Sequence, residues 1–263
     1  MKVLITTSNK YLHLLVPFST LFNKYWPGQD VTFLGFDNPN IPELPDNFNY
    51  VSLGKQSDFG TYWTNPIIPY INELKDDYFA ITCEDLVLTH PIDLKKLNML
   101  EEEVKLGNVD KAMLDSHLNW NLRFKGEMHP YKEGILKLSQ FAEYRTSLSP
   151  AIWRKEYFMR YCKPNMTIWD FELKNMPESQ RDRATIISLD QDEWLLKYGN
   201  VYKKGKPWPH YDATPSNGKP MLWGTEFGIK KEDILFVYQY LPEEVQRADK
   251  DFLDSLDDNI LHY

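Results

Sequence analysis

The first third of the chain alternates two hydrophobic patterns. Short continuous apolar runs are typical of buried strands, whereas apolar residues every three or four positions are typical of helices with one buried face. The runs predict strands at residues 3–7, 31–36, 49–53 and 78–83, and the spaced patterns predict helices at 11–25 and 62–74. This alternation favours a mainly parallel sheet with helices on both faces. In such sheets, ligands bind beyond the carboxyl ends of the strands.

The rest of the chain is less regular. It predicts strands at residues 111–114, 147–153 and 185–189, and helices at 154–161 and 242–259. Residues 200–220 are rich in Gly, Pro and Lys, which predicts a loop or hairpin. The length of 263 residues suits a single α/β domain with two halves, residues 1–110 and 111–263.

Composition narrows the function classes. Acidic residues outnumber basic ones by 38 to 30, and the net charge of −8 argues against broad nucleic-acid binding. The two cysteines, Cys83 and Cys162, lack metal-binding spacing, which excludes a zinc ribbon and fits a reducing compartment. The apolar run at the N-terminus is too short for a signal peptide, and none approaches the ~18 residues of a membrane span. We therefore expect a cytoplasmic protein.

The most informative motif is Cys83-Glu84-Asp85, which places two acids directly after the strongest strand. Acids there are costly unless they are paired, hydrated or bound to a cation. Mg²⁺ and Mn²⁺ bind carboxylate and diphosphate oxygens together. Two solvated acids at the junction between a strand and a turn are an alternative explanation of the same motif.

A Rossmann-like half followed by an apolar strand that ends in acids resembles the GT-A fold of glycosyltransferases, over roughly residues 1–210. The usual acidic motif of that family is Asp-x-Asp; Cys83-Glu84-Asp85 looks like the Glu-Asp variant of phage and bacterial sugar transferases. The resemblance implies a GT-A-like domain whose first half binds a nucleotide-sugar and whose second half binds the acceptor. It also implies Asp85 as a ligand of Mn²⁺ or Mg²⁺ and Glu84 beside the donor. Because the motif departs from the usual form, metal dependence stays open.

A second acidic segment, Thr167-Ile168-Trp169-Asp170-Phe171-Glu172, lies where the family places a catalytic acid. In inverting members this acid is the general base that takes the proton of the acceptor hydroxyl. The resemblance implies Asp170 or Glu172 in this role. The residues alone equally predict a helix start, with Thr167 as N-cap and Asp170 three positions later. Retaining chemistry also stays open.

The most basic segment surrounds Gly205. Lysines beside a glycine can approach a diphosphate closely, and GT-A enzymes often close a C-terminal loop over the donor, some with a metal-binding histidine. The resemblance implies donor contacts for three lysines and a metal contact for one histidine: Lys203, Lys204, Lys206 and His210. A solvated hairpin tip would have the same composition.

Four more residues are candidates for the nucleoside end of the donor. Thr6 and Thr7 follow the first strand and Asp37 follows the second, where a base or ribose binds in this architecture. Helix capping and an Asp-Asn-Pro turn explain these residues equally well. Trp63 is a stacking candidate that is more typical of a core.

The resemblance implies that the acceptor is a glycan or another hydroxyl compound. One alternative is a phage enzyme that glycosylates hydroxylated bases in DNA, for which the lysine segment would form a basic rim. A second is a nucleotidyltransferase, which usually has a Gly-rich loop after its first strand; residues 6–10 contain no Gly. A third is a non-catalytic carbohydrate-binding protein.

Overall fold

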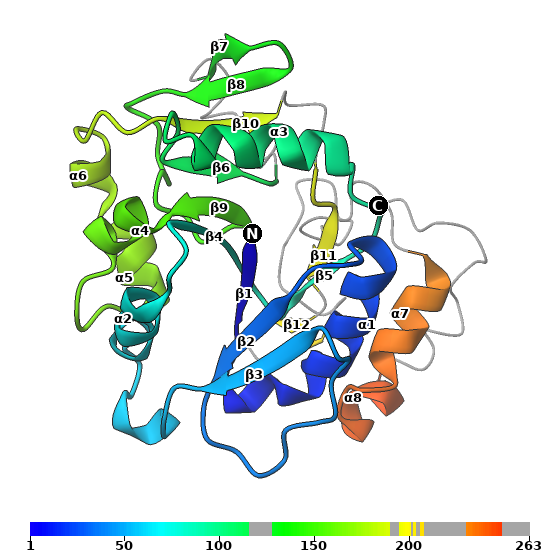
Figure 1. Ribbon diagram of the computed structural model, residues 1–263. Coiled ribbons are helices and arrows are strands. Elements are labelled where there is room, and N and C mark those ends of the chain that lie inside the picture. The colour runs from blue at the N-terminus through cyan, green and yellow to red at the C-terminus, as the bar shows by residue number, and fades with distance from the viewer. Residues whose placement is uncertain (116–127, 190–194, 201, 204–205, 208–229, 249–263) are drawn as a thin grey trace.

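A nine-stranded sheet forms the centre of the molecule in the computed structural model (Figure 1). The structure describes residues 1–115, 128–189, 195–200, 202–203, 206–207 and 230–248. The strand order is β3-β2-β1-β4-β9-β6-β10-β8-β7. Helices cover both faces of this sheet, so the predicted α/β class is confirmed.

The first half of the sheet is parallel, as the sequence predicts. It consists of β1 (Lys2–Thr6), β2 (Val31–Gly35), β3 (Phe48–Ser52) and β4 (Tyr78–Cys83). In β1 alternate residues enter different cores: Val3 and Ile5 join one apolar cluster, and Leu4 joins the other. A strand covered on both faces needs a continuous apolar run, which is why these strands are readable in the sequence.

The second half of the sheet is mixed. Its strands are β6 (Lys111–Met113), β7 (Met128–Lys132), β8 (Ile135–Leu138), β9 (Ala151–Arg154) and β10 (Ile186–Leu189). β9 runs antiparallel to both of its neighbours, β4 and β6, and β8 runs antiparallel to β10 and β7. Four of the eight neighbouring pairs are therefore antiparallel, and the expectation of a mainly parallel sheet holds only for the half from β3 to β4.

The helices divide between the two faces. The cluster that contains Val3 and Ile5 takes in the 3-10 helix η1 (Asn9–Leu14), α1 (Leu15–Tyr25), α3 (Leu94–Lys105) and α7 (Lys231–Tyr238). The cluster that contains Leu4 takes in α2 (Thr64–Glu73), α4 (Lys155–Tyr161) and α5 (Ile168–Leu173). The short helices η2 (Gln56–Asp58), α6 (Met176–Ser179) and α8 (Glu243–Ala248) complete the helical elements of the described chain.

Several element boundaries differ from the sequence prediction. The helix expected from residue 11 begins as η1 and becomes α-helical only at Leu15; Pro17, which has no backbone N–H, falls in that first α-turn. The strand expected from residue 147 begins at Ala151, directly after Pro150. The hairpin expected after residue 200 is present as β12 (Tyr202–Lys203) and β13 (Lys206–Pro207). The helix expected at 242–259 is seen as α8, and its remainder lies outside the described residues.

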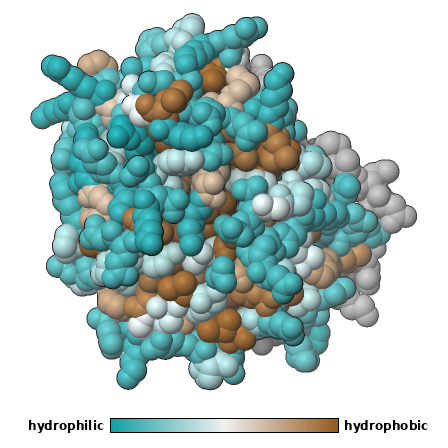
Figure 2. Space-filling model, in the orientation of Figure 1, coloured by the Kyte–Doolittle hydropathy of each residue, from teal (hydrophilic) through white to brown (hydrophobic). Residues whose placement is uncertain are grey.

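The visible surface is mostly hydrophilic. Figure 2 shows small separate apolar patches among polar side chains on one face of the molecule. None of the described helices is both long and apolar enough to cross a bilayer.

Gly35, the last residue of β2, supplies a stability prediction. A Cβ at this position would lie 2.6 Å from Cζ of Tyr50 and 2.9 Å from Cγ2 of Thr7. The Tyr50 hydroxyl donates to the carbonyl of Phe36 and accepts from its N–H, so the ring cannot move without losing both bonds. We expect Gly35→Ala to lower the free energy of unfolding by about 1–3 kcal/mol, the usual cost of overpacking, measured by urea denaturation.

The matched test is the double variant with Tyr50→Phe. Removing the hydroxyl releases the ring, so Gly35→Ala should cost less in that background. Equal costs in both backgrounds would show that Tyr50 is not the obstacle.

Candidate functional site

The candidate site lies at the carboxyl ends of the parallel strands. Thr7 follows β1, Asp37 follows β2, and the pair Glu84 and Asp85 follows β4. β1 is hydrogen-bonded to both β2 and β4, with Thr6 in register with Leu34 and Cys83. The topology therefore brings these predicted residues together at the carboxyl ends of the parallel strands, which form the edge of the sheet that is meant in the rest of this subsection.

Glu84 ties the turn after β1 to the turn after β4. Its side chain is buried and receives hydrogen bonds from the Thr7 side chain and the Ser8 backbone. Burial raises the pKa of Glu84 well above its usual range, and the neighbouring Asp85 charge raises it further. Glu84 therefore acts inside the protein, whereas the half-buried Asp85 is the acid of the pair that a ligand can reach.

The basic hairpin starts beside Asp85. Directly after Asp85, β5 (Leu86–Leu88) pairs antiparallel with β11 (Tyr198–Asn200), and Asn200 lies opposite Leu86 (Figure 1). The β12–β13 hairpin, which contains Lys203 and Lys206, follows β11 within two residues. The placement of these two side chains is not described, and Lys204 and His210 lie outside the described residues.

Asp37 lies at the exposed rim of the same edge. Its carboxylate accepts a hydrogen bond from the Ser52 hydroxyl, and its backbone carbonyl accepts one from the Asn9 amide at 3.4 Å. The Asn9 backbone N–H in turn donates to Gln56 at 3.0 Å. Four polar side chains from separate elements thus meet where the architecture predicts the nucleoside.

Two of the predicted donor residues have structural contacts. The Thr6 hydroxyl lies 3.5 Å from the Cys83 sulfur, between neighbouring strands. Trp63 packs edge-on against Phe171, with ring centroids 5.6 Å apart, and against Phe158. Its ring therefore packs with the aromatic core beneath α5.

The antiparallel direction of β9 brings a further segment to the site. Ala151, the first residue of β9, pairs with Ile81 near the carboxyl end of β4 and with Met113 at the carboxyl end of β6. The turn of residues 145–148 precedes β9 and reaches the same edge. That turn contacts α5, which contains both candidate bases.

The two candidate bases differ in their contacts. Asp170 forms the capping box of α5: Oδ2 accepts from the Thr167 N–H at 3.1 Å, and the Asp170 N–H donates to the Thr167 hydroxyl. Its Oδ1 pairs with Lys174 at 2.7 Å. The Lys174 contact, followed by the Thr167 backbone, lowers the pKa of Asp170. Both oxygens of Asp170 are thus used at the helix start.

Glu172 is held through one oxygen only. Its Oε1 accepts from the Leu148 N–H at 2.7 Å and from the Ser147 hydroxyl at 3.4 Å. Within the described residues, no hydrogen bond is made to Oε2. The Leu148 N–H that holds Glu172 lies shortly before β9, whose first residue, Ala151, pairs with Ile81 of β4. Glu172 is therefore held by the segment that enters the sheet beside the carboxyl end of β4.

Sequence reasoning missed Asp115, two residues after β6. Its side chain is 1 % exposed, and Oδ2 accepts a hydrogen bond from the Tyr198 hydroxyl at 2.7 Å. Burial raises the pKa of Tyr198, and Asp115, Asp85 and Cys83 add to the rise, so these groups share one neighbourhood. The sequence signal for Asp115 is an apolar run that ends in an acid, the same pattern that singles out Glu84.

Lys111, the first residue of β6, was also missed. Its side chain is wholly buried, and Nζ donates to the backbone carbonyls of Ser147 at 2.7 Å and Arg145 at 3.2 Å. Burial lowers the pKa of Lys111 to about 7, although Asp115 and Glu172 oppose the shift. This lysine lies directly behind the turn that holds Glu172.

No cluster of three or more His, Cys, Asp or Glu side chains placed to hold a metal ion occurs among the described residues. Magnesium sites in phosphate-transferring enzymes often use one or two protein carboxylates and complete their coordination with substrate phosphates. Asp85 suits that arrangement because it is a hard oxygen donor at the site edge.

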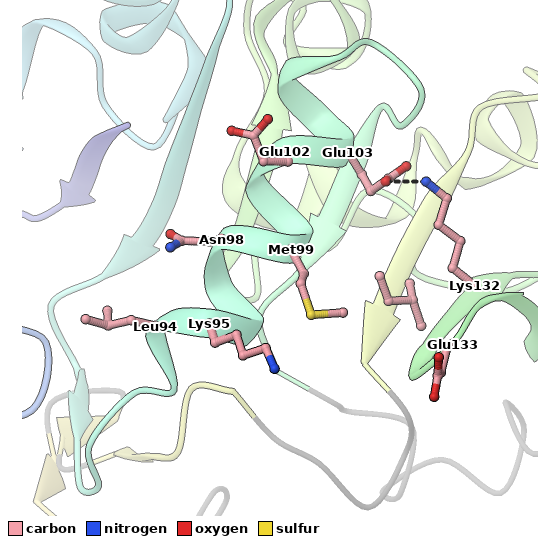
Figure 3. Close-up of a pocket in the computed structure, with 9 residues that line it drawn as sticks. Leu94, Lys95, Asn98, Met99, Glu102, Glu103, Lys132 and Glu133 are labelled. Atoms are coloured by element: carbon pink, nitrogen blue, oxygen red, sulfur yellow. Dashed lines mark hydrogen bonds and ion pairs between the residues drawn. The ribbon is translucent and has the colours of Figure 1, made fainter.

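A separate groove of about 730 Å³ lies between α3 and the β7–β8 hairpin (Figure 3). Its wall includes Leu94, Met99 and Ile135, and Glu103 pairs with Lys132 at its rim. None of the candidate site residues lines it. We therefore place the site at the strand ends, where polar side chains from several elements converge.

Comparisons with known proteins give limited information. No family model and no curated protein matches the chain. Among solved structures, residues 1–349 of TarS from S. aureus align with a TM-score of 0.48 at 13 % identity, covering 75 % of this chain and 58 % of that one. A longer structure of S. aureus TarS also gives 0.48, at 12 % identity, with 72 % and 35 % covered. A CMP:2-keto-3-deoxy-manno-octonic acid synthetase complexed with CTP gives 0.40 at 10 % identity, with 71 % and 88 % covered.

The chain thus spans 58 % and 35 % of the two TarS structures it matches. At these TM-scores and identities, the likeness carries no statement about the reaction. The case for a function rests on the site itself.

The buried Lys111 predicts a pH-dependent stability. A group whose pKa is lowered in the folded state contributes stability that is present above its unfolded pKa of 10.5 and lost as the pH falls through about 7. Relative to Lys111→Met, the wild type should therefore gain stability between pH 7 and 10, approaching about 1.4 kcal/mol per pH unit within that window. Urea denaturation at several pH values measures this difference.

Lys155→Met is the matched control. Lys155 also donates to two backbone carbonyls, those of Asn72 and Leu74, but it is not buried. Its removal should leave the pH dependence unchanged. If the unfolding free energies of the wild type and of Lys111→Met change in parallel with pH, the pKa of Lys111 is not lowered.

Proposed function

We propose that this protein is a glycosyltransferase that moves a sugar from a nucleotide-diphosphate sugar to an acceptor hydroxyl, assisted by Mn²⁺ or Mg²⁺. The observation that carries the proposal is that Asp85 and the segment that holds Glu172 lie at the same end of the strands. Asp85 follows β4 beside a basic hairpin, and one oxygen of Glu172 is held by the segment leading into β9, whose first residue pairs with β4.

The first half supplies the donor contacts. Thr7, Asp37 and the groups around Asp37 suit the hydroxyls and polar edges of a nucleoside. Asp85 would hold a cation against the donor diphosphate, and Lys203, Lys204, Lys206 and His210 would add positive charge or a ligand from the hairpin side. When bound, the cation neutralises charge that develops on the leaving diphosphate. In an enzyme with net charge −8, such local cations are needed to hold a diphosphate.

Glu172 supplies the base. With Oε1 fixed by Leu148 and Ser147, Oε2 is the oxygen that takes the acceptor proton. The acceptor oxygen then forms a bond to the anomeric carbon while the bond from that carbon to the diphosphate oxygen breaks. The nucleoside diphosphate leaves with the bonding electrons, and the sugar is transferred with inversion.

The donor half is tested by Asp85→Asn. This change removes a charge without changing size, so the fold should remain and cation-dependent donor binding should be lost. Thermal-shift assays with UDP, GDP and CDP, each with and without Mn²⁺, should identify a stabilising nucleotide for the wild type, and calorimetry should show at least about tenfold weaker binding in the variant.

Asp76→Asn is the control, since this exposed acid precedes the same strand at its opposite end. The Asp76→Asn variant should bind the nucleotide with wild-type affinity. If the Asp85→Asn variant keeps the wild-type, Mn²⁺-dependent nucleotide affinity, Asp85 is not a metal ligand.

The catalytic half is tested by comparing Glu172→Gln with Asp170→Asn. Glutamine keeps an oxygen for the Leu148 N–H but cannot take a proton, so kcat should fall by roughly 10²–10⁴-fold with donor affinity intact. Asp170→Asn should lower thermal stability through the weakened cap, with a much smaller effect on kcat. Release of nucleoside diphosphate from UDP-glucose, UDP-N-acetylglucosamine and GDP-mannose with Mn²⁺ reports turnover even with water as acceptor.

The reverse pattern would assign the base to Asp170. If both variants turned over normally, the single-displacement mechanism with a base on α5 would be wrong. Addition of hydroxylated DNA to the same assay separates a DNA acceptor from a glycan acceptor.

A further inference from the structure

Lys111 is an unusual residue for the inside of a sheet. Its side chain is 0 % exposed, and its ammonium lies 4.1 Å from the centroid of the Trp153 ring. Both of its hydrogen bonds go to backbone carbonyls, those of Arg145 and Ser147. Burying an ammonium is costly even with such partners, whereas an apolar residue would fill a β-strand position at no such cost. The contacts of the ammonium therefore indicate what it does.

The two carbonyls belong to the 145–148 turn, and every residue after Arg145 in that turn contacts Glu172. The Thr146 hydroxyl donates to the Glu172 carbonyl at 3.1 Å. The Ser147 hydroxyl and the Leu148 N–H donate to Oε1 of its carboxylate. Lys111 thus holds one side of the turn, and Glu172 is bound on the other.

The remaining side of the turn is held by Arg145, which is also wholly buried. Its guanidinium donates to the carbonyls of Ser139, Ser179 and Ala184, and lies 3.5 Å from Asp182. These partners fix where the turn starts. Lys111 is the group that fixes its middle, at the carbonyl of Ser147, next to the N–H that holds Glu172.

We infer that Lys111 is a positioning residue for Glu172: through the Ser147 carbonyl it sets the turn whose N–H and hydroxyl hold Oε1, and so directs Oε2 toward the acceptor. This inference rests on the proposed role of Glu172 as general base. It assigns to Lys111 an effect on the rate and none on donor binding.

The charged groups that face Lys111 agree with this role. Asp115 from the end of β6 and Glu172 from α5 favour its charged form, and Arg145 from the turn opposes it. The two acids and the two carbonyls together hold the ammonium against the turn that binds Glu172.

The experiment uses Lys111→Met, which keeps the apolar stem and removes the ammonium, in wild-type and Glu172→Gln backgrounds. The assay is release of nucleoside diphosphate from the three nucleotide sugars with Mn²⁺. A 1 Å misplacement of a catalytic group can cost roughly 10²-fold, so kcat should fall by roughly 10- to 100-fold, with KM for the donor and nucleotide affinity unchanged. In the Glu172→Gln background the same change should cost almost nothing, because the group that it positions is gone.

Two further variants keep the test decisive. Lys155→Met should leave kcat unchanged, because the Lys155 ammonium contacts the carbonyls of Asn72 and Leu74 and not those of the 145–148 turn. Ser147→Ala removes one bond to Oε1 without touching Lys111, and it should lower kcat by a few-fold only when Glu172 is present. If Lys111→Met fails to fold, Ser147→Ala still tests the turn, and a rate loss that persists in Glu172→Gln would overturn the inference.

The outcomes separate this inference from the proposed function. Normal turnover by the Glu172→Gln variant would show that Glu172 is not the general base. If the Glu172→Gln variant is slow and the Lys111→Met variant has normal kcat, Glu172 remains the base and Lys111 does not position it. Equal losses from Lys111→Met in both backgrounds would show a purely structural role for Lys111.

Discussion

A buried carboxyl group has to find hydrogen-bond partners, and Glu84 finds them across two strands. Besides its own backbone N–H, its partners are Thr7 and Ser8, which follow β1, whereas Glu84 follows β4, so these bonds form only if the two strands end level with each other. They tie the turn after β1 to the chain that continues through Asp85 into β5. The position of the β11 chain follows in turn, because β11 pairs with β5 immediately after Asp85.

The second constraint is the direction of β9. A parallel strand at this position would place its preceding turn at the opposite edge of the sheet. Because β9 is antiparallel to β4 and β6, its first residue lies beside their carboxyl ends. Segments that are distant in the sequence thus meet at the carboxyl ends of β4 and β6. The predicted donor residues follow parallel strands, whereas Glu172 is held by the residues that precede β9. Buried cations on that side, Lys111 and Arg145, stabilise a turn that has little apolar surface of its own.

The first half of the fold could be predicted because each of its strands is a continuous apolar run. The direction of β9 could not, since an apolar run has the same composition whichever way it lies. Helix α3 was overlooked, although Asp93 caps its first turn, because charged residues dilute its apolar spacing. Glu84, Asp85 and Glu172 were recognised as acids beside predicted elements. Lys111 was overlooked because a single charged residue at the start of a three-residue strand looks like an ordinary surface position. Asp115 ends an apolar run, as Glu84 does, but only long-range contacts reveal that both residues are buried.

The hairpin at the far edge of the sheet affects how copies of the protein meet. Among the described strands, β7 is the outermost at this end, and it contains Pro130, with an irregularity in its pairing between Pro130 and Lys132. Proline has no N–H to offer a new strand, and a bulge twists the edge away from a flat partner. An exposed edge with neither feature is a template for strand addition. β7 is therefore a poor template for strand addition, which disfavours pairing between copies of the protein at this end of the described sheet.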